Sequence, residues 1–97
     1  MRWIVIFEDA PGMQAVREQH EAEHFAYLCE NQNEVLLAGG LRDGPESPFG
    51  GGLWVLAQMP RERAVYLVER DPYFLATRRP YRLLQWGKAL RDIDVVL

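Results

Sequence analysis

The most constraining feature of the sequence is a pair of short runs that are apolar on both faces of a β-strand. Residues 3–7 form a continuous run of β-branched and aromatic residues, closed by the turn-forming stretch EDAPG. Residues 52–58 alternate leucine and valine on one face with tryptophan and leucine on the other. Both runs are therefore predicted to be buried strands, and neither has a polar face to turn toward water.

Two helices and two further strands complete the expected order of elements. Over residues 13–30 the inward-facing positions recur at i, i+3 and i+4, which predicts a long amphipathic helix. Further strands are expected at residues 34–41 and 81–86. A second helix is expected to begin with Pro60 at its first position and to end near Asp71, because a residue that precedes proline is pushed out of the helical region. The last residues of the C-terminal tail are a candidate fifth strand.

This order, β-α-β-β-α-β, predicts an α+β fold of the ferredoxin-like type, with a four-stranded antiparallel sheet and both helices on one face. Two helices cover one face of the sheet only, so the other face would expose an apolar patch that a soluble monomer rarely tolerates. We therefore expect a homodimer packed sheet to sheet, a dimeric α+β barrel. The 97 residues suffice for one domain, predicted to span residues 1–97.

Composition and charge exclude several classes of protein. The formal net charge is −3 and no basic stripe is present, so no nucleic-acid partner is expected. The single cysteine, Cys29, cannot form an internal disulfide, which fits a reducing cytosol. The apolar run near the N-terminus is too short for a signal peptide or a membrane span. These observations predict a cytoplasmic protein with no membrane partner.

The stretch HEAEH at residues 20–24 has the spacing of a zinc peptidase motif, in which two histidines one turn apart bind the metal. A catalytic zinc needs a third protein ligand, and the extended motif would place a glycine and a histidine where this chain has Tyr27 and Glu30. The sequence therefore predicts no metal. A site made by His20, His24 and a carboxylate remains the weaker alternative.

Both histidines lie on the inward face of the first helix. Each is either a core histidine satisfied by the backbone or a general acid or base, since histidine titrates near neutrality. Asp71 also has two interpretations. As the residue before Pro72 it is a favoured helix N-cap, and as a carboxylate at the end of the second helix it needs a nearby cation. A histidine from the first helix would be such a cation, and Asp71 would then orient the imidazole.

Three other features carry weaker signals. The 42–52 loop contains Ser47 and ends in three glycines, so it is either a plain hairpin loop or a segment that closes over a ligand. Arg78 and Arg79 are expected to be solvated surface charges. No role is predicted for Cys29.

Several motifs together resemble the YCII-related family, over about residues 1 to 90. The most specific are H-x-x-Y-L at residues 24–28, A-G-x-L at 38–41 and D-P-Y at 71–73. The resemblance implies a ferredoxin-like, dimeric α+β barrel in which His24 and Asp71 form the active site. At least one branch of the family acts on chlorinated hydroxylated aromatics.

The chain departs from the usual family pattern at three positions. Glu21 stands where the family often has arginine, Gly40 where it often has proline, and Gly52 where it often has serine. The change at residue 21 removes a positive charge beside the site, which puts an anionic substrate in doubt, although His20 is a substitute cation at low pH.

The first functional hypothesis is a cofactor-independent enzyme of the isomerase, lyase or dehydrohalogenase type. In it, His24 transfers a proton on a small cyclic or aromatic substrate while Asp71 orients the imidazole. The residues expected to bind the substrate are His20, Tyr27, Tyr73 and Trp86. The alternative hypothesis is a non-catalytic dimer that binds a small molecule or another protein, with the same His–Asp pair serving as a structural hydrogen bond.

Overall fold

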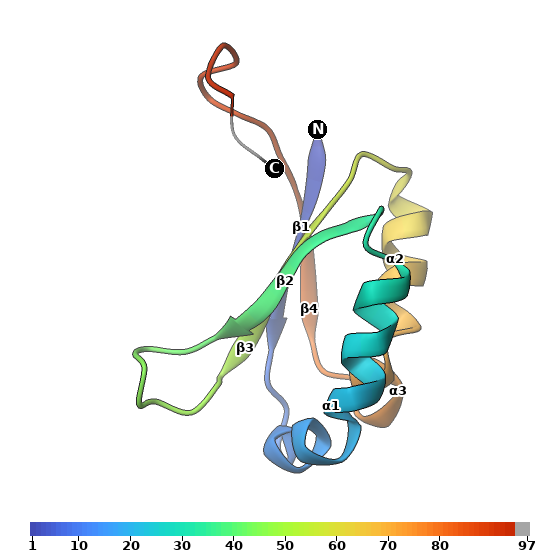
Figure 1. Ribbon diagram of the computed structural model, residues 1–97, viewed down its shortest axis with the longest axis vertical. Helices are drawn as coiled ribbons and strands as arrows, with labels where there is room; N and C mark the ends of the chain where they lie inside the picture. Colours follow the sequence, from blue (N-terminus) through green and yellow to red (C-terminus); the bar gives the residue numbers. More distant parts are fainter. Residues whose placement is uncertain (95–97) are drawn as a thin grey trace.

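The computed structural model describes residues 1–94 and confirms the ferredoxin-like α+β fold (Figure 1). The elements in chain order are β1 (Arg2–Glu8), α1 (Met13–Glu30), β2 (Val35–Leu41), β3 (Gly51–Leu56), α2 (Arg61–Glu69), α3 (Pro72–Ala76) and β4 (Tyr81–Trp86). The strands form one antiparallel sheet in the order β2-β3-β1-β4. Figure 1 shows all three helices on one side of this sheet.

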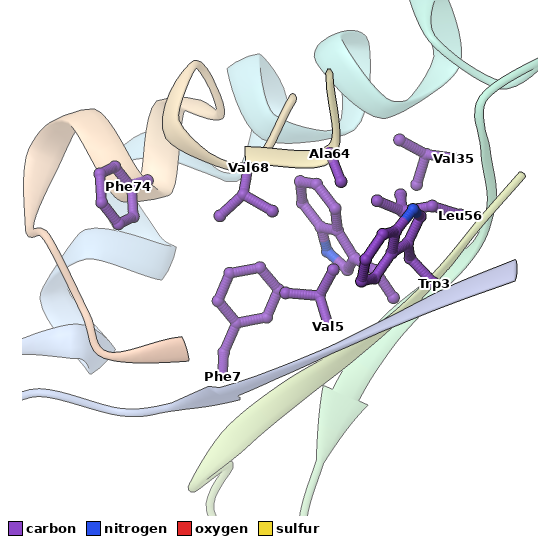
Figure 2. Packing of buried hydrophobic residues seen from close by; sticks show 9 residues of the cluster. Trp3, Val5, Phe7, Val35, Leu56, Ala64, Val68 and Phe74 are labelled. Carbon is purple, nitrogen blue, oxygen red and sulfur yellow. The ribbon is translucent and has the colours of Figure 1, made fainter. Parts of the chain in front are cut away.

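The side chains of the two central strands alternate between the two faces of the sheet, as predicted. On β1, Trp3, Val5 and Phe7 point toward the helices and are buried, while Ile4 and Ile6 point to the opposite face. Figure 2 shows the resulting core between the sheet and the helices. Its buried members are Trp3, Val5, Phe7, Val35, Trp54, Leu56, Ala64, Val68 and Phe74.

A glycine marks the start of α1, and a tyrosine hydroxyl links α1 to α2. Gly12 has a φ of 85°, a left-handed conformation that glycine adopts without steric cost, and it turns the chain into α1. The hydroxyl of Tyr27 on α1 donates a hydrogen bond of 2.7 Å to the carbonyl of Leu67 on α2. The buried residues of α2 are Ala64, Leu67 and Val68.

The structure differs from the sequence prediction in a few details. Pro60 is the N-cap of α2, with an extended ψ of 150°, and not its first helical residue. A β-bulge interrupts β2 between Val35 and Leu37. The candidate fifth strand falls on the end of the tail, and residues 95–97 lie outside the described residues. In the part of the chain that the structure describes, no helix has both the length and the apolar character needed to cross a bilayer.

The face of the sheet that carries no helix is apolar along its middle. Ile4 of β1 pairs with Val55 of β3 on one side and with Leu84 of β4 on the other, and Val55 pairs in turn with Leu37 of β2. Leu37 is 52% exposed and Leu84 is 38% exposed. A row of aliphatic side chains therefore crosses all four strands on the uncovered face.

Candidate active site

A histidine from the middle of α1 and an aspartate just before α3 form a buried pair. His24 Nδ1 and Asp71 Oδ1 are 2.5 Å apart, and the two residues are 7% and 0% exposed. Asp71 is the N-cap of α3, but its side chain makes no capping bond, and only its carbonyl accepts the N–H of Leu75 at 2.9 Å. The carboxylate is therefore available to the imidazole, and the contact predicted from the sequence is confirmed.

This contact fixes the role of each imidazole nitrogen. A carboxylate accepts a hydrogen bond, so Nδ1 carries the proton, and Nε2 of the neutral ring is a base. Within residues 1–94, Nε2 has no hydrogen-bond partner, and neither has the second carboxylate oxygen, Oδ2 of Asp71. An ionised aspartate held at this distance also stabilises the imidazolium that forms when Nε2 takes up a proton.

Aromatic side chains hold the His24 ring in place. The ring of Tyr73 stacks on it with a centroid distance of 3.8 Å and an interplanar angle of 8°. Trp54 of β3 and Phe25 of α1 lie further out, at centroid distances of 6.4 Å and 5.8 Å. Burial, and then the charge of Glu21, raise the pKa of Tyr73, so its hydroxyl stays protonated at neutral pH.

A cavity of about 150 Å³ opens beside the imidazole. A dry cavity of about this volume in another protein holds one benzene molecule, so this one has room for a single six-membered ring. The residues that line it come from α1, β2, β3, α3 and the segments that follow β2 and α3. They are Arg17, Glu21, His24, Phe25, Leu28, Ala38, Gly39, Gly40, Phe49, Gly51, Gly52, Trp54, Tyr73 and Arg79.

Two arginines in the cavity wall share one carboxylate. Arg17 binds Asp9 through two bonds, of 2.6 Å and 3.0 Å, and also donates to the carbonyl of Gly51 at 3.2 Å. Arg79 makes a longer contact, of 3.5 Å, with the same carboxylate. Its guanidinium lies 4.1 Å from the centroid of the Phe7 ring. Burial lowers the pKa of Arg79 against the opposing effect of the nearby carboxylates.

The position of Arg79 corrects the sequence prediction. Arg79 is 3% exposed and lines the cavity, whereas the neighbouring Arg78 is exposed as expected. Nothing in the local sequence separates these two arginines. The distinction depends on Asp9 and Phe7, which are about seventy residues away in the chain and reach Arg79 through the pairing of β1 with β4.

The segment between β2 and β3 contributes Phe49 to the cavity wall. The ring of Phe49 lies directly on Gly40, where an added Cβ would be 2.6 Å from the ring atoms Cδ1 and Cε1. The guanidiniums of Arg17 and Arg42 lie over the same ring, at 5.1 Å and 5.0 Å from its centroid. The loop thus contributes one aromatic side chain to the cavity wall.

Comparison with known proteins places this geometry in a family. Residues 1–86 match the YCII-related domain. The chain belongs to the YCII-related family. No curated protein matches the sequence.

Two solved structures share the fold. One is a 5-chloro-2-hydroxyhydroquinone dehydrochlorinase, TftG, from Burkholderia phenoliruptrix AC1100, in complex with 2,5-dihydroxybenzoquinone. It has a TM-score of 0.75 and 20% sequence identity, over 90% of this chain and 94% of that one. The other is the NE2512 protein of unknown function from Nitrosomonas europaea, with a TM-score of 0.50 and 19% identity, over 97% of this chain and 93% of that one. At these identities the likeness shows the fold alone.

Of the four residues expected to bind substrate in this YCII-related chain, only Tyr73 lines the cavity. The hydroxyl of Tyr27 is used by α2, and burial raises its pKa to about 12. Trp86 lies opposite Arg2, on the face of the sheet that carries no helix, because even-numbered residues of β4 point there. His20 lies one turn before His24, outside the cavity wall.

The two histidines of the zinc-like motif have partners other than a metal in the structure. His20 Nδ1 is 3.5 Å from Glu23 Oε2, close enough for an ion pair when the ring is protonated but without hydrogen-bond geometry. His24 uses Nδ1 to bind Asp71. Within residues 1–94, no group of three side chains that could hold a metal ion is present.

Proposed function

We propose that this member of the YCII-related family is an enzyme in which His24 transfers a proton on a small hydroxylated ring. The observation that carries the proposal is the buried His24–Asp71 pair beside a cavity large enough for one six-membered ring. A histidine that served only as a structural link would not need an adjoining cavity, whereas a general base must meet its substrate.

The proton would move between the substrate and Nε2 of His24. Neutral His24 accepts a proton from a ring hydroxyl, and Asp71 stabilises the imidazolium through Nδ1–H. The imidazolium then returns a proton to a ring carbon. Such a transfer from oxygen to carbon interconverts enol and keto forms of the ring, which is the step that isomerases and dehydrohalogenases share.

The substrate class we propose is a chlorinated trihydroxybenzene. TftG, which shares the fold, is a dehydrochlorinase of such a compound. Loss of HCl from this ring takes a proton from a hydroxyl, forms a C–H bond at the ring and then expels chloride with the electrons of the C–Cl bond as a second hydroxyl loses its proton. The product is a hydroxyquinone, and no oxidant is needed because chloride carries away the electron pair.

We also propose that the protein is a single-domain, cytoplasmic homodimer whose two sheets pack against each other. The row of Leu37, Val55, Ile4 and Leu84 supports this, because a second copy would cover the aliphatic face that no helix covers. The solution mass at micromolar concentration should be that of two chains. A single-chain mass would contradict the proposal.

The function is tested by measuring chloride release from 5-chloro-2-hydroxyhydroquinone under anaerobic conditions. The variant His24→Ala should lower kcat by roughly 10²- to 10⁴-fold, the usual contribution of a general acid or base. Asp71→Asn should cause a loss of similar size, because it presents Nδ1 with a partner that also permits the wrong tautomer. The matched control is His20→Ala, which changes a histidine on the same helix that does not line the cavity.

Each outcome has a clear meaning. If His24→Ala retains the wild-type kcat while staying folded, His24 is not the acid or base. If the wild-type protein binds 2,5-dihydroxybenzoquinone but releases no chloride, the non-catalytic binding dimer is the better description.

A further inference from the structure

Glu21 is the one carboxylate in the wall of the cavity that residues 1–94 form. It lies on α1, one turn before His24. Within residues 1–94, none of the side-chain hydrogen bonds and ion pairs involves Glu21. An ionised carboxylate only accepts hydrogen bonds, so Glu21 offers the cavity an acceptor that no donor of the described chain occupies.

The neighbours of Glu21 on α1 explain why its carboxylate is free. Arg17 lies four residues earlier, a position from which helical ion pairs often form. Its guanidinium is instead bound to Asp9 through two hydrogen bonds, of 2.6 Å and 3.0 Å. His24 lies three residues later and uses Nδ1 to bind Asp71. The two cationic groups nearest along the helix are therefore held by other carboxylates.

The carboxylate of Glu21 acts on the part of the cavity that adjoins the imidazole. After burial, its charge is the largest cause of the raised pKa of Tyr73, and the Tyr73 ring stacks on His24 with a centroid distance of 3.8 Å. The cavity has room for a single six-membered ring. A ring that places one hydroxyl at Nε2 of His24 therefore brings its other substituents to a wall that includes Glu21.

We propose that Glu21 determines which rings the cavity accepts: its carboxylate accepts a hydrogen bond from a second ring hydroxyl and repels a ring that carries a carboxylate there. A chlorinated trihydroxybenzene has three hydroxyls, and only one of them meets His24 first. A hydrogen bond to a charged acceptor is strong, and repulsion of the competing ligand adds to the specificity. The inference rests on the proposed function in taking this cavity as the place where the substrate ring binds, but it is tested by binding alone.

The two arginines in the cavity wall are the main objection, because they would attract an anionic ring. Both contact the carboxylate of Asp9, so Arg17, Arg79 and Asp9 together carry one formal positive charge. Glu21 carries one negative charge and balances it. The wall as a whole therefore does not favour an anion, and the substituent that faces Glu21 decides between two rings of the same size.

The probes for this inference are hydroquinone and 4-hydroxybenzoate, two phenols that differ only in the group opposite the shared hydroxyl. That group is a second hydroxyl in the first and an ionised carboxylate at neutral pH in the second. In anaerobic calorimetric titrations, the wild-type protein should bind hydroquinone about tenfold or more tightly, as expected for a hydrogen bond to a charged group. Equal affinities, a preference for 4-hydroxybenzoate or no binding of hydroquinone overturns the inference without any variant.

Variants then show which residue is responsible for the preference. Glu21→Gln removes the charge, so most of the tenfold preference should be lost, and Glu21→Lys should reverse it. The matched control is Glu18→Gln, which changes the net charge equally at an exposed residue of α1 that does not line the cavity. A melting curve of each variant shows whether it is folded. If Glu21→Gln retains the wild-type preference, another part of the wall makes the distinction and the inference is wrong.

The inference and the proposed function fail separately. If chloride is not released but the preference for hydroquinone depends on Glu21, the specificity is real and the reaction must be another one. If chloride release depends on His24 while Glu21→Gln distinguishes the two rings as the wild type does, the reaction stands and the role of Glu21 does not.

Discussion

The layer between the sheet and the helices consists of two regions with opposite chemistry. Around α2, the packed side chains are apolar, among them Trp3, Leu56 and Ala64 (Figure 2). The indole N–H of Trp3 is satisfied there by the carbonyl of Met59 at 2.8 Å. Where α1 meets α3, the same layer contains the buried polar residues His24 and Asp71, with the cavity beside them.

The unsatisfied polar atoms follow the same division. Three buried side-chain atoms lack a hydrogen-bond partner among residues 1–94. Asp71 Oδ2 and Arg79 Nε belong to the region around the cavity, and His20 Nδ1 lies one turn of α1 before His24. Buried polar groups without partners destabilise a folded protein and are uncommon in native structures. None of these atoms lies in the α2 region, so the α2 region stabilises the fold, while the region where we propose the chemistry carries a cost in stability.

The largest effect on stability is expected in the α2 region. Leu56 is fully buried, so Leu56→Ala should destabilise the protein by about 2–5 kcal/mol, through lost burial and the void left behind. For a chain of this size that corresponds to a fall in Tm of roughly 10 °C or more. Differential scanning calorimetry measures the change.

The control for that variant is Leu75→Ala, at a leucine that is 67% exposed, which should change the stability by less than about 0.5 kcal/mol. At temperatures where Leu56→Ala is folded, its affinity for 2,5-dihydroxybenzoquinone should equal that of the wild type. A Leu56→Ala protein as stable as Leu75→Ala would show that the two regions do not divide stability from chemistry.

Much of the fold and the central pair was accessible from the sequence because local rules determine them. Helix α1 has the predicted bounds because its inward residues keep the helical period from Met13 onward. An inward-facing histidine of the first helix and an aspartate before a proline at the end of the second helix suggested the pair, and the resemblance to the family selected His24 over His20.

The rest of the site depends on contacts between distant parts of the chain. Arg79 is buried because β1 brings Asp9 and Phe7 beside it, and Phe49 reaches the cavity because Gly40 leaves room for its ring. Neither contact leaves a periodic or motif signal near the residue itself. Local pattern therefore cannot distinguish Arg79 from Arg78.

For Trp86, which was expected to bind the substrate, the sequence did carry a usable signal. Tyr81 and Leu83 pack against the core, so the two-residue period of β4 places Trp86 on the opposite face of the sheet. Its aromatic character alone suggested a pocket wall, whereas its parity along the strand argues against one. The position of Trp86 along the strand, and not its residue type, therefore determines which face it lines.

A smaller effect is expected from the glycine beneath Phe49. Gly40→Ala introduces a methyl group 2.6 Å from the Phe49 ring, so the ring has to leave its present position in the cavity wall. Loss of one aromatic side chain from the cavity wall should weaken the binding of 2,5-dihydroxybenzoquinone by about fivefold, or roughly 1 kcal/mol. Absorbance titration measures the affinity.

Gly39→Ala is the matched control for this variant. The backbone of Gly39 lines the cavity, but an added Cβ would point to the opposite face of the sheet and meets nothing within 4 Å. Gly39 pairs with Leu53 on the face where we propose that a second copy binds, so the mass of the control in solution is measured as well. Equal affinities for the two variants would show that Phe49 is not part of the binding site.

A last effect, confined to the boundary between the two regions, concerns Tyr27. Burial, and then the charge of Asp71, raise its pKa to about 12, above the value near 10 that a tyrosine has in an unfolded chain. The folded state therefore holds the phenol proton more tightly than the unfolded state does. The resulting stabilisation is complete below pH 10 and is lost as the pH rises from about 10 through 12.

The variant Tyr27→Phe should lose about 1 kcal/mol at pH 7 with the hydrogen bond to Leu67, and its Tm should fall less steeply than that of the wild type between pH 10 and 12. Some slope should remain, because burial and the bond to Glu69 raise the pKa of Tyr81 to about 12 as well. The double variant, Tyr27→Phe with Tyr81→Phe, should reduce the fall of Tm with pH further. If the Tm of Tyr27→Phe falls as steeply between pH 10 and 12 as that of the wild type, the Tyr27 hydroxyl does not link α1 to α2 in solution. The boundary between the two regions is then looser than this hydrogen bond indicates.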